Sequence, residues 1–341
     1  MQKILWSMVV GMCICQGSEA SYTLQDGRLM KTEELATLSV QEHYSLAKDA
    51  FQQERWDDVI RQARIILLNF PGTIFAADVH YDLGVAYFHR EELDLANEHL
   101  SKYLQKNKAL KFFEETMAYK FAIAEQFAAG VKHRLLGKHN LPKWFSAKRE
   151  AIDLYDEVIQ ALPQHDLAVR ALFGKGRVLF LEEDFKESIE TYQTLLRRFP
   201  KHPLVLDSYL AIIEVYRTQG DEEYPDPDYL DLAEIQLQKC KRDFPGDERL
   251  ARAEVLLEEM QDVYAKDLYE TAQFYERTKK LAASRLYYSR LVAKYPRAKS
   301  VLAAEERIAV LNQILGVPDP VIPPSEQRMI VDDSASNEDV R

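Results

Sequence analysis

The residues of this sequence that could do chemistry are its histidines, cysteines and paired carboxylates. A zinc hydrolase needs ligands at helical spacing, as in HExxH, or a mixed set of cysteine and histidine. The eight histidines are scattered, and no cysteine completes a pair of them. The paired carboxylates Glu222–Glu223 and Glu258–Glu259 are expected on acidic turns or exposed helix faces, where acidic residues are common because they are solvated. The sequence therefore predicts no enzyme, no metal site and no cofactor.

One acidic segment, Gly220–Asp228, has enough carboxylates to suggest calcium ligation. It lacks the D-x-D-x-D-G-x5-E spacing of a calcium loop, and Pro225 and Pro227 interrupt it. We therefore interpret it as a proline-broken turn. No glycine-rich phosphate loop occurs in the chain either, which argues against a nucleotide-binding fold.

The first twenty residues form a candidate leader. They combine Lys3, an apolar run from Ile4 to Cys15, and small residues at Ser18 and Ala20. This order is typical of a secretory signal peptide, here cleaved after Ala20, and the apolar run is too short to span a bilayer as a helix.

The cysteines leave one alternative open. Cys13 or Cys15 could be the lipidated first residue of a lipoprotein, although each follows a large residue, Met12 or Ile14. Cys240 is the third cysteine and cannot form an intrachain disulfide with either if the leader is removed. We expect it to be an inert core residue.

A basic insertion at residues 132–149 contrasts with the rest of the chain. It contains six Lys or Arg residues and no Asp or Glu, within a protein of net charge −11. Basic residues beside exposed aromatic residues suit an acidic protein groove, a lipid headgroup surface or a nucleic acid. The alternative is a solvated loop whose tryptophan packs onto the next helix. The candidate partner-binding residues are Lys132, Arg134, Lys138, Lys143, Trp144, Phe145, Lys148 and Arg149.

The elements that position these residues follow a repeat, for which Phe185–Pro200 is the reference unit. Its apolar residues stand three or four apart, so they line one face of a helix that a proline ends. Similar units close at Pro71, Pro163, Pro245 and Pro296. An apolar helix precedes each of them, which gives helix–turn–helix units of about 34 residues, the tetratricopeptide period. The chain is therefore predicted to be all-α, a tetratricopeptide-repeat solenoid of about five to six helix pairs with a capping helix.

Small residues recur twelve positions apart, where the two helices of a pair are expected to cross closely. A glycine inside a helix costs about 1 kcal/mol relative to alanine, so its presence there needs a reason in the packing. The predicted repeat-packing residues are Gly84, Ala96, Gly176, Ser188, Tyr192, Ala272 and Ser284.

The predicted organisation begins with the signal peptide at 1–20 and a lead-in at 21–40, with a short helix possible from Thr32. An unbroken helix is expected from Asp247 to Arg277, and residues 316–341 form a disordered acidic tail. The repeat array spans 41–315, with pairs at about 41–71, 75–108, 115–163, 167–200, 204–245 and 264–296 and the capping helix at 300–315.

Similarity to a known family lies in the closures of the second helices: Asn69-Phe-Pro71, Arg198-Phe-Pro200, Asp243-Phe-Pro245 and Lys294-Tyr-Pro296. With the interrupted middle pair and Tyr269–Tyr275 inside a long helix, they make residues 41–314 resemble the BamD family of outer-membrane assembly lipoproteins. Other periplasmic repeat proteins, which coordinate cell-wall synthesis with envelope constriction, share the same period.

The resemblance implies a non-enzymatic protein-binding scaffold, exported and located in the periplasm at the inner face of the outer membrane. The implied partners are the barrel-assembly protein and unfolded outer-membrane proteins, with peripheral or lipid-anchored membrane association. The alternative is a periplasmic adaptor for cell-wall synthesis or envelope constriction. The acidic net charge argues against nucleic acid as a partner.

Overall fold

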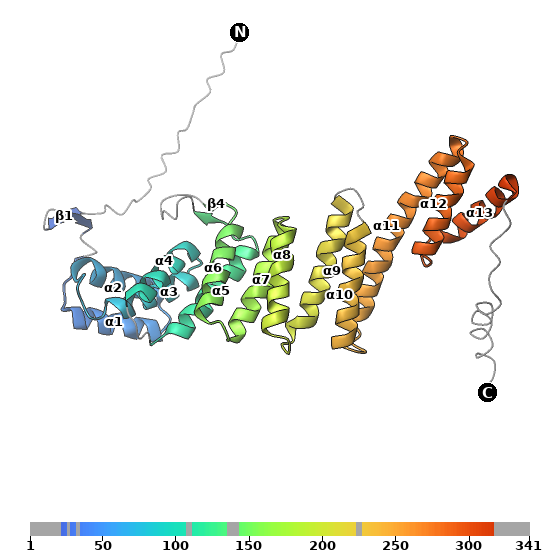
Figure 1. Cartoon of the computed structure of the whole chain (residues 1–341). Coiled ribbons are helices and arrows are strands. Elements are labelled where there is room, and N and C mark those ends of the chain that lie inside the picture. The colour runs from blue at the N-terminus through green and yellow to red at the C-terminus, as the bar shows by residue number, and fades with distance from the viewer. Residues whose placement is uncertain are drawn as a thin grey trace, which may run out of the picture. The chain divides into compact units, whose positions relative to one another are not determined.

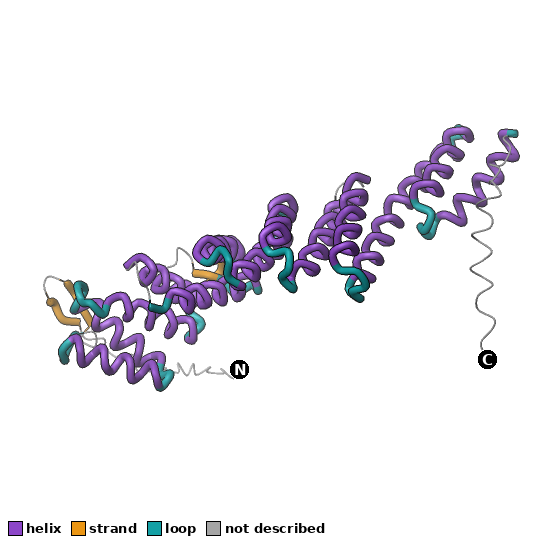
Figure 2. Tube along the Cα trace, turned by 60° about the horizontal axis from the view of Figure 1, so that its bottom comes forward, coloured by secondary structure: helices purple, strands orange, loops and turns teal. Residues whose placement is uncertain are grey.

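The computed structural model describes residues 22–25, 28–31, 35–106, 111–134, 143–222 and 227–316. These residues are mainly helical, with short strands before the first helix and in the basic insertion (Figure 2). The chain divides into two compact units, Met1–Ala168 and Val169–Arg341. The predicted signal peptide at 1–20 and the tail from residue 317 onward lie outside the described residues.

Unit 1 consists of helix pairs whose members run alongside each other (Figure 1). A two-stranded antiparallel sheet precedes them, and a second one lies between the helices of the third pair. Its elements are β1 (Tyr22–Gln25), β2 (Arg28–Lys31), α1 (Val40–Gln52), α2 (Trp56–Asn69), α3 (Ala76–His89), α4 (Leu93–Lys106), α5 (Phe113–Ala128), β3 (His133–Arg134), β4 (Lys143–Phe145) and α6 (Lys148–Ala161).

Unit 2 continues the same arrangement and ends on a single helix that packs against the last pair. Its elements are α7 (Asp166–Leu181, whose first turn precedes the unit boundary), α8 (Phe185–Arg198), α9 (Leu204–Glu222), α10 (Pro227–Asp243), α11 (Leu250–Arg277), α12 (Leu281–Lys294) and α13 (Val301–Leu315). The prediction of an all-α array of helix pairs with a capping helix is confirmed, and α11 is the unbroken helix expected there.

The first helix of a pair ends in the same three-residue turn in four of the pairs. The middle residue of this turn is left-handed, with φ between 55° and 62°, at Glu54, Glu91, Glu183 and Lys279. The residue after it donates its N–H to the carbonyl five positions earlier, at 2.9 Å in each pair. This is the Schellman arrangement, which usually places glycine at the left-handed position. The repeated geometry explains why each pair reverses direction over so few residues.

The second helix ends on a residue outside the helical conformation, followed by proline. Phe70, Leu162, Phe199 and Tyr295 have φ between −127° and −132°, and each donates its N–H to the carbonyl four residues earlier. Proline forces its predecessor out of the helical region and cannot itself donate. The aromatic–proline closures seen in the sequence are therefore helix stops.

The glycines of the repeat allow the two helices of a pair to approach closely. A Cβ atom on Gly84 would lie 2.5 Å from Cδ2 of Leu100 and 3.3 Å from its backbone nitrogen. A Cβ atom on Gly176 would lie 2.7 Å from the ring of Tyr192. Leu100 and Tyr192 are buried, so neither can move away freely.

The residues twelve positions after the small residues also lie inside the pairs. Ala96, Ser188 and Ser284 are fully buried, and so is Ala272, the partner of Ser284. The hydroxyl of Ser188 donates to the carbonyl of Gly176 at 2.8 Å, which joins α8 to α7 at the crossing point.

The irregular segments contain short strands that the sequence did not predict. In the lead-in, β1 pairs with β2. A short helix from Thr32 was considered possible, and residues 35–39 are not helical. The side chain of Ser39 instead starts α1 through a capping box with Glu42. The basic insertion also contains paired strands, and its last two residues, Lys148 and Arg149, belong to the first turn of α6.

We predict that Gly84→Ala destabilises unit 1 by about 1–3 kcal/mol, because the new methyl group must displace Leu100 or push α4 away from α3. Gly72→Ala is the matched control in the same unit, since nothing lies within 4 Å of its added Cβ. The control should change stability by less than about 1 kcal/mol. Urea denaturation followed by circular dichroism measures both, and equal effects would refute the close-approach explanation.

Candidate protein-binding surfaces

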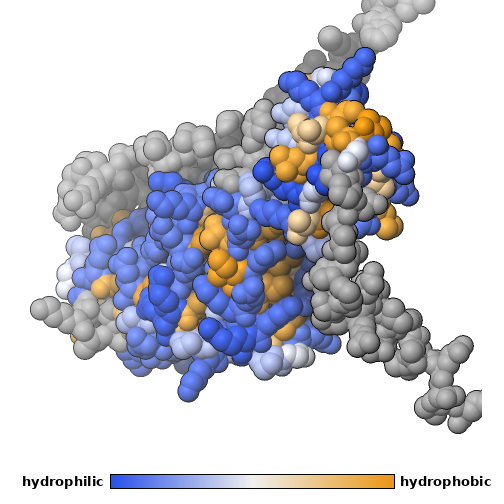
Figure 3. All heavy atoms as spheres, turned by 45° about the vertical axis from the view of Figure 1, so that its right-hand side comes forward, coloured by the Kyte–Doolittle hydropathy of each residue, from blue (hydrophilic) through white to orange (hydrophobic). Residues whose placement is uncertain are grey.

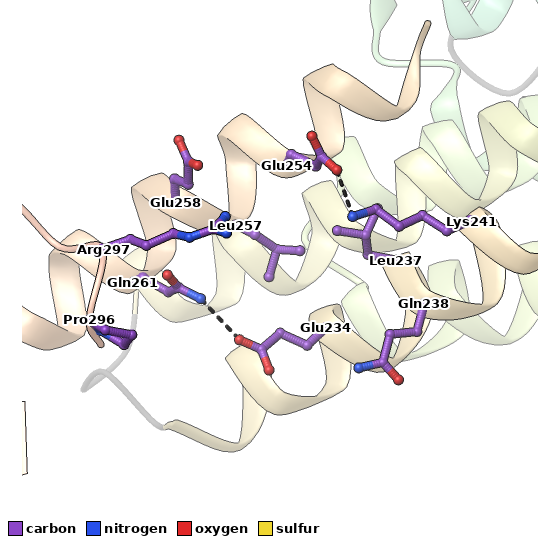
Figure 4. Close-up of a pocket in the computed structure, with 10 residues that line it drawn as sticks. All are labelled: Glu234, Leu237, Gln238, Lys241, Glu254, Leu257, Glu258, Gln261, Pro296 and Arg297. Carbon is purple, nitrogen blue, oxygen red and sulfur yellow. Dashed lines mark hydrogen bonds and ion pairs between the residues drawn. The ribbon is translucent and has the colours of Figure 1, made fainter. Parts of the chain in front are cut away.

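A pocket of about 310 Å³ opens between α10 and α11 in unit 2 (Figure 4). Leu237 and Leu257 supply its apolar part, and the start of the segment after α12 closes one side. Its lining residues are Glu234, Leu237, Gln238, Lys241, Glu254, Leu257, Glu258, Gln261, Pro296 and Arg297. The leucines face each other because both follow the buried stripe of an amphipathic helix.

Two polar contacts join the helices across this pocket. Lys241 pairs with Glu254 at 2.6 Å, and the amide of Gln261 donates to Glu234 at 3.1 Å (Figure 4). The contact with Lys241 lowers the pKa of Glu254, so this carboxylate stays ionised. These pairs connect α10 to α11 at the pocket.

Unlike these paired residues, Arg297 and Glu258 make no ion pair or side-chain hydrogen bond within the part of the chain that the structure describes. Figure 4 shows the guanidinium of Arg297 directed across the pocket beside Leu257. The arrangement offers an apolar floor and one available cation and anion at its edge. Such a surface can take an apolar side chain flanked by a polar or charged group.

Apolar side chains also interrupt the hydrophilic surface elsewhere (Figure 3). On the last three helices the most exposed are Leu302 (75%), Ile314 (61%), Leu286 (57%) and Phe274 (53%). Single exposed apolar residues are common on soluble proteins, so this distribution does not by itself define a site.

Two histidines, His80 on α3 and His99 on α4, form a part-buried pair that the sequence did not predict. Their Nδ1 atoms lie 3.0 Å apart, and they line a pocket of about 450 Å³ with Lys102 and Lys106. Burial lowers the pKa of His80 to about 4, with further contributions from His99 and the two lysines. Burial, then Lys102, lowers the pKa of His99 to about 4, while Glu98 opposes the shift and Arg64 adds to it. Both rings are therefore neutral near pH 7.

Lys120 is a second residue that sequence reasoning missed. Its side chain is fully buried on α5, yet the ammonium group has three oxygen partners. It donates to Asn97 at 2.9 Å, to Ser101 at 2.8 Å and to the carboxylate of Glu157. All three N–H groups are thus satisfied, and α4, α5 and α6 are joined. Its place at i+3 from Met117, within a buried stripe, was the signal that could have revealed it.

The structure places the predicted partner-binding residues on one segment but describes few of their side chains. Lys132 is exposed before β3, Arg134 lies on β3, and β3 contacts α4. Lys143, Trp144 and Phe145 form β4. Lys138 lies outside the described residues, as do Cys13 and Cys15. Lys148 is half-buried and Arg149 exposed on α6.

The described residues also bear on metal binding, thiol chemistry and membrane insertion. No group of three or more potential ligands comes together within the described ranges. Cys240 is buried, and its environment raises the pKa of the thiol to about 11, so it is not a reactive thiolate. None of the described helices is both long and apolar enough to cross a membrane.

Comparison with known protein families tests the family resemblance that the sequence suggested. The family described as "YfiO: Outer membrane lipoprotein" matches residues 147–322, which is more than half of the chain. The chain belongs to the YfiO family. This confirms the resemblance to the BamD lipoproteins. A tetratricopeptide-repeat family also matches residues 44–109. Both families consist of non-catalytic scaffolds for protein interaction.

Other comparisons give more distant similarity. No curated protein matches the chain. Among solved structures, MamA has 15% identity and a TM-score of 0.37, covering 62% of this chain and 94% of its own. YrrB, titled a TPR protein with an unusual peptide-binding site, has 13% identity and a TM-score of 0.37, covering 63% and 92%. A tetratricopeptide repeat protein from Parabacteroides merdae has 11% identity and a TM-score of 0.38, covering 80% and 98%.

We predict that the histidine pair makes this YfiO-family protein less stable as the pH falls from about 6.5 to about 4. The folded pKa values lie below the ordinary value of 6.5, so the unfolded chain binds more protons in this window. Each additional proton contributes a slope of about 1.4 kcal/mol per pH unit. Urea denaturation at several pH values measures the slope.

The double variant His80→Gln, His99→Gln should flatten this dependence, whereas His165→Gln should not. His165 is the control because it is exposed and its ring accepts a hydrogen bond from the backbone N–H of Leu167. An unchanged slope in the double variant would assign the pH dependence to other groups.

Proposed function

We propose that this chain is a non-enzymatic scaffold of the outer-membrane β-barrel assembly machinery. The YfiO match carries the proposal, because residues 147–322 include every helix from α6 to α13. The proposed location is the periplasmic side of the outer membrane, and the proposed partners are the barrel-assembly protein and unfolded outer-membrane proteins. Tetratricopeptide arrays bind proteins through surfaces formed by successive helices, so the role needs no catalytic residue.

The pocket between α10 and α11 is the proposed contact for the permanent partner. Leu237 and Leu257 would pack against an apolar side chain, and Arg297 would pair with a carboxylate next to it. We assign this contact to the barrel-assembly protein because the pocket lies within the family match. A folded partner can hold both groups in one fixed geometry, which reduces the entropy lost on binding.

The basic insertion is proposed as a second docking segment, on the strength of its sequence. Its positive charge within an acidic protein would attract an acidic partner surface, and Trp144 would supply the apolar anchor. Insertions that interrupt a repeat are common positions for binding elements.

Affinity capture from envelope membranes tests the function, and we expect the barrel-assembly protein to be recovered. Arg297→Glu should reduce its affinity about tenfold, because the substitution places a like charge against the partner's carboxylate. Arg252→Glu is the matched control, since Arg252 is an exposed arginine of α11 outside the pocket. The purified partner and a titration on an optical biosensor would give the affinities.

Recovery of penicillin-binding proteins without any barrel protein would overturn the assembly role and favour the cell-wall adaptor. For the insertion, Lys138→Glu with Lys143→Glu should weaken binding mainly at low salt, because salt screens exposed charges. Trp144→Ala should weaken it at every salt concentration. If both variants bind like the parent while remaining folded, the insertion is not a docking segment.

Mass spectrometry of the mature protein tests the proposed export route. A diacylated or triacylated Cys13 or Cys15 is expected if the anchor is lipid, and Ser21 as the first residue if the protein is released by signal cleavage. An intact Met1 in envelope fractions would contradict both routes.

A further inference from the structure

The pocket that contains the histidine pair has a positively charged wall. It lies in unit 1, where the end of α2 meets α3 and α4, and its volume is about 450 Å³. His80, His99, Lys102, Gln105 and Lys106 supply its polar groups. Among the residues that the structure describes, no carboxylate lines it. In a chain of net charge −11, a concave site with two ammonium groups and no acid favours a negatively charged ligand.

Lys106 is the available cation of this wall. It is exposed in the last turn of α4 and makes no ion pair or side-chain hydrogen bond within the described part of the chain. Lys102 lies one turn earlier and pairs with Glu98, which is outside the lining. Lys106 can therefore pair with a bound anion without first breaking an internal contact.

The histidine pair can add a positive charge when an anion binds. The Nδ1 atoms of His80 and His99 lie 3.0 Å apart, so one ring donates its Nδ1–H to the other. In this neutral pair the Nε2 atom of the donating ring carries no proton. A proton taken up there preserves the Nδ1 contact and gives both rings an N–H at Nε2. A nearby anion favours this state, because opposite charge raises the pKa of a histidine.

The groups whose charges act on the two rings come from the helices packed around them. After burial and His99, Lys106 and Lys102 lower the pKa of His80, and Glu98 opposes them. For His99, Arg64 of α2 adds to the effects of burial and Lys102. On α3, the ring of Tyr87 stacks on His99 with centroids 5.5 Å apart. Cations thus outnumber carboxylates around the pair, which is the balance that an anion would improve.

Unit 2 has a pocket at the same place in the repeat, which provides a comparison. This pocket of about 320 Å³ lies between α8, α9 and α10. Tyr209 lines it nine residues after the closing Pro200, as His80 lines the first pocket nine residues after Pro71. The hydroxyl of Tyr209 donates to the carboxylate of Asp243 at 2.9 Å. The groove is therefore a property of the repeat, and the histidine pair gives it in unit 1 the capacity to take up a proton.

We propose that the pocket between α2, α3 and α4 binds the phosphate group of a phosphomonoester. Such a group carries a charge of about −1.5 to −2 at pH 7 and three acceptor oxygens, which suits several N–H donors better than a carboxylate does. Leu67 and Pro71 complete the wall and offer an apolar surface to the esterified group. The lysines disfavour a metal ion, and no third ligand joins the histidines within the described ranges.

This inference goes beyond the proposed function and does not depend on it. Helices α2, α3 and α4 precede the YfiO match at 147–322, and the barrel-assembly contact is assigned to unit 2. Lys106→Gln should therefore still capture the barrel-assembly protein. Failure of the parent to capture any barrel protein would refute the assembly role, whereas phosphate binding is measured without that partner.

Isothermal titration calorimetry of the intact protein with phenyl phosphate tests the proposal, and we expect binding. Lys106→Gln should weaken the affinity about threefold, the size of an exposed ion pair. Lys239→Gln is the matched control and should leave it unchanged, because Lys239 is an exposed lysine that lines the corresponding pocket of unit 2. Absence of phenyl phosphate binding, or equal weakening by the two variants, would overturn the proposal.

Nuclear magnetic resonance of the histidine rings gives a second readout that a general charge effect would not move. Saturating phenyl phosphate should raise the pKa of His80 or His99 above the value of about 4 in the free protein. The resonance of His165, which is exposed and outside the pocket, should not shift. Unchanged pKa values for both pocket histidines, with phenyl phosphate bound, would place the ligand elsewhere and refute the assignment.

Flotation with vesicles distinguishes a lipid headgroup from a soluble ester. The vesicles contain phosphatidylcholine with or without phosphatidic acid, whose headgroup is a phosphomonoester. Flotation that requires phosphatidic acid and is weakened by Lys106→Gln would identify a lipid, and phenyl phosphate binding without flotation would identify a soluble ester. If Lys138→Glu with Lys143→Glu abolishes phenyl phosphate binding while Lys106→Gln has no effect, the basic insertion binds phosphate and the proposal is wrong.

Discussion

The close crossing of the two helices in a pair is the constraint on which the repeats depend. At Gly84 and Gly176 the second helix brings Leu100 and Tyr192 into the space that a Cβ would fill. The turn before it must then reverse the chain within three residues, which the left-handed Glu91 and Glu183 achieve without glycine. A left-handed conformation costs a non-glycine residue about 1–2 kcal/mol. That cost is tolerable because the crossing buries a complete apolar stripe on each helix.

Two buried charges in unit 1, the ammonium of Lys120 and the carboxylate of Asp82, have partners of opposite charge on other helices. Lys120 uses its three N–H groups on α4 and α6, and Lys48 spans both oxygens of a carboxylate that is 1% exposed. Removing one partner from such a pair leaves an uncompensated charge, at a cost of about 3–5 kcal/mol. These contacts therefore specify which helices are neighbours, in addition to the apolar core that holds them together.

The parts that follow from local periodicity could be predicted from the sequence. Tyr192 is buried, α11 runs unbroken, and the aromatic–proline closures end helices. Each of these features was predictable because it depends on residue spacing within one segment. The contact between His80 and His99 could not be predicted in this way, since it depends on how α3 and α4 are rotated against each other. Lys120 was missed for the related reason that its partners come from two other helices, α4 and α6. The strands in the lead-in and the insertion are short and lack a clear alternating pattern, so the sequence gives little warning of them.

The family match and the folding units do not share a boundary, and this has a physical consequence. The match begins at residue 147, just before α6, whereas unit 1 extends to Ala168. The buried residues of α6 pack on α5, where Phe121 and the carboxylate of Glu125 contact Tyr155. Glu157 of α6 also neutralises the buried ammonium of Lys120. Because α5 lies outside the matched residues, the first matched helix depends on a repeat that the family match leaves out. Helix α5 is therefore part of the folded support of α6, the first helix of the YfiO-like segment.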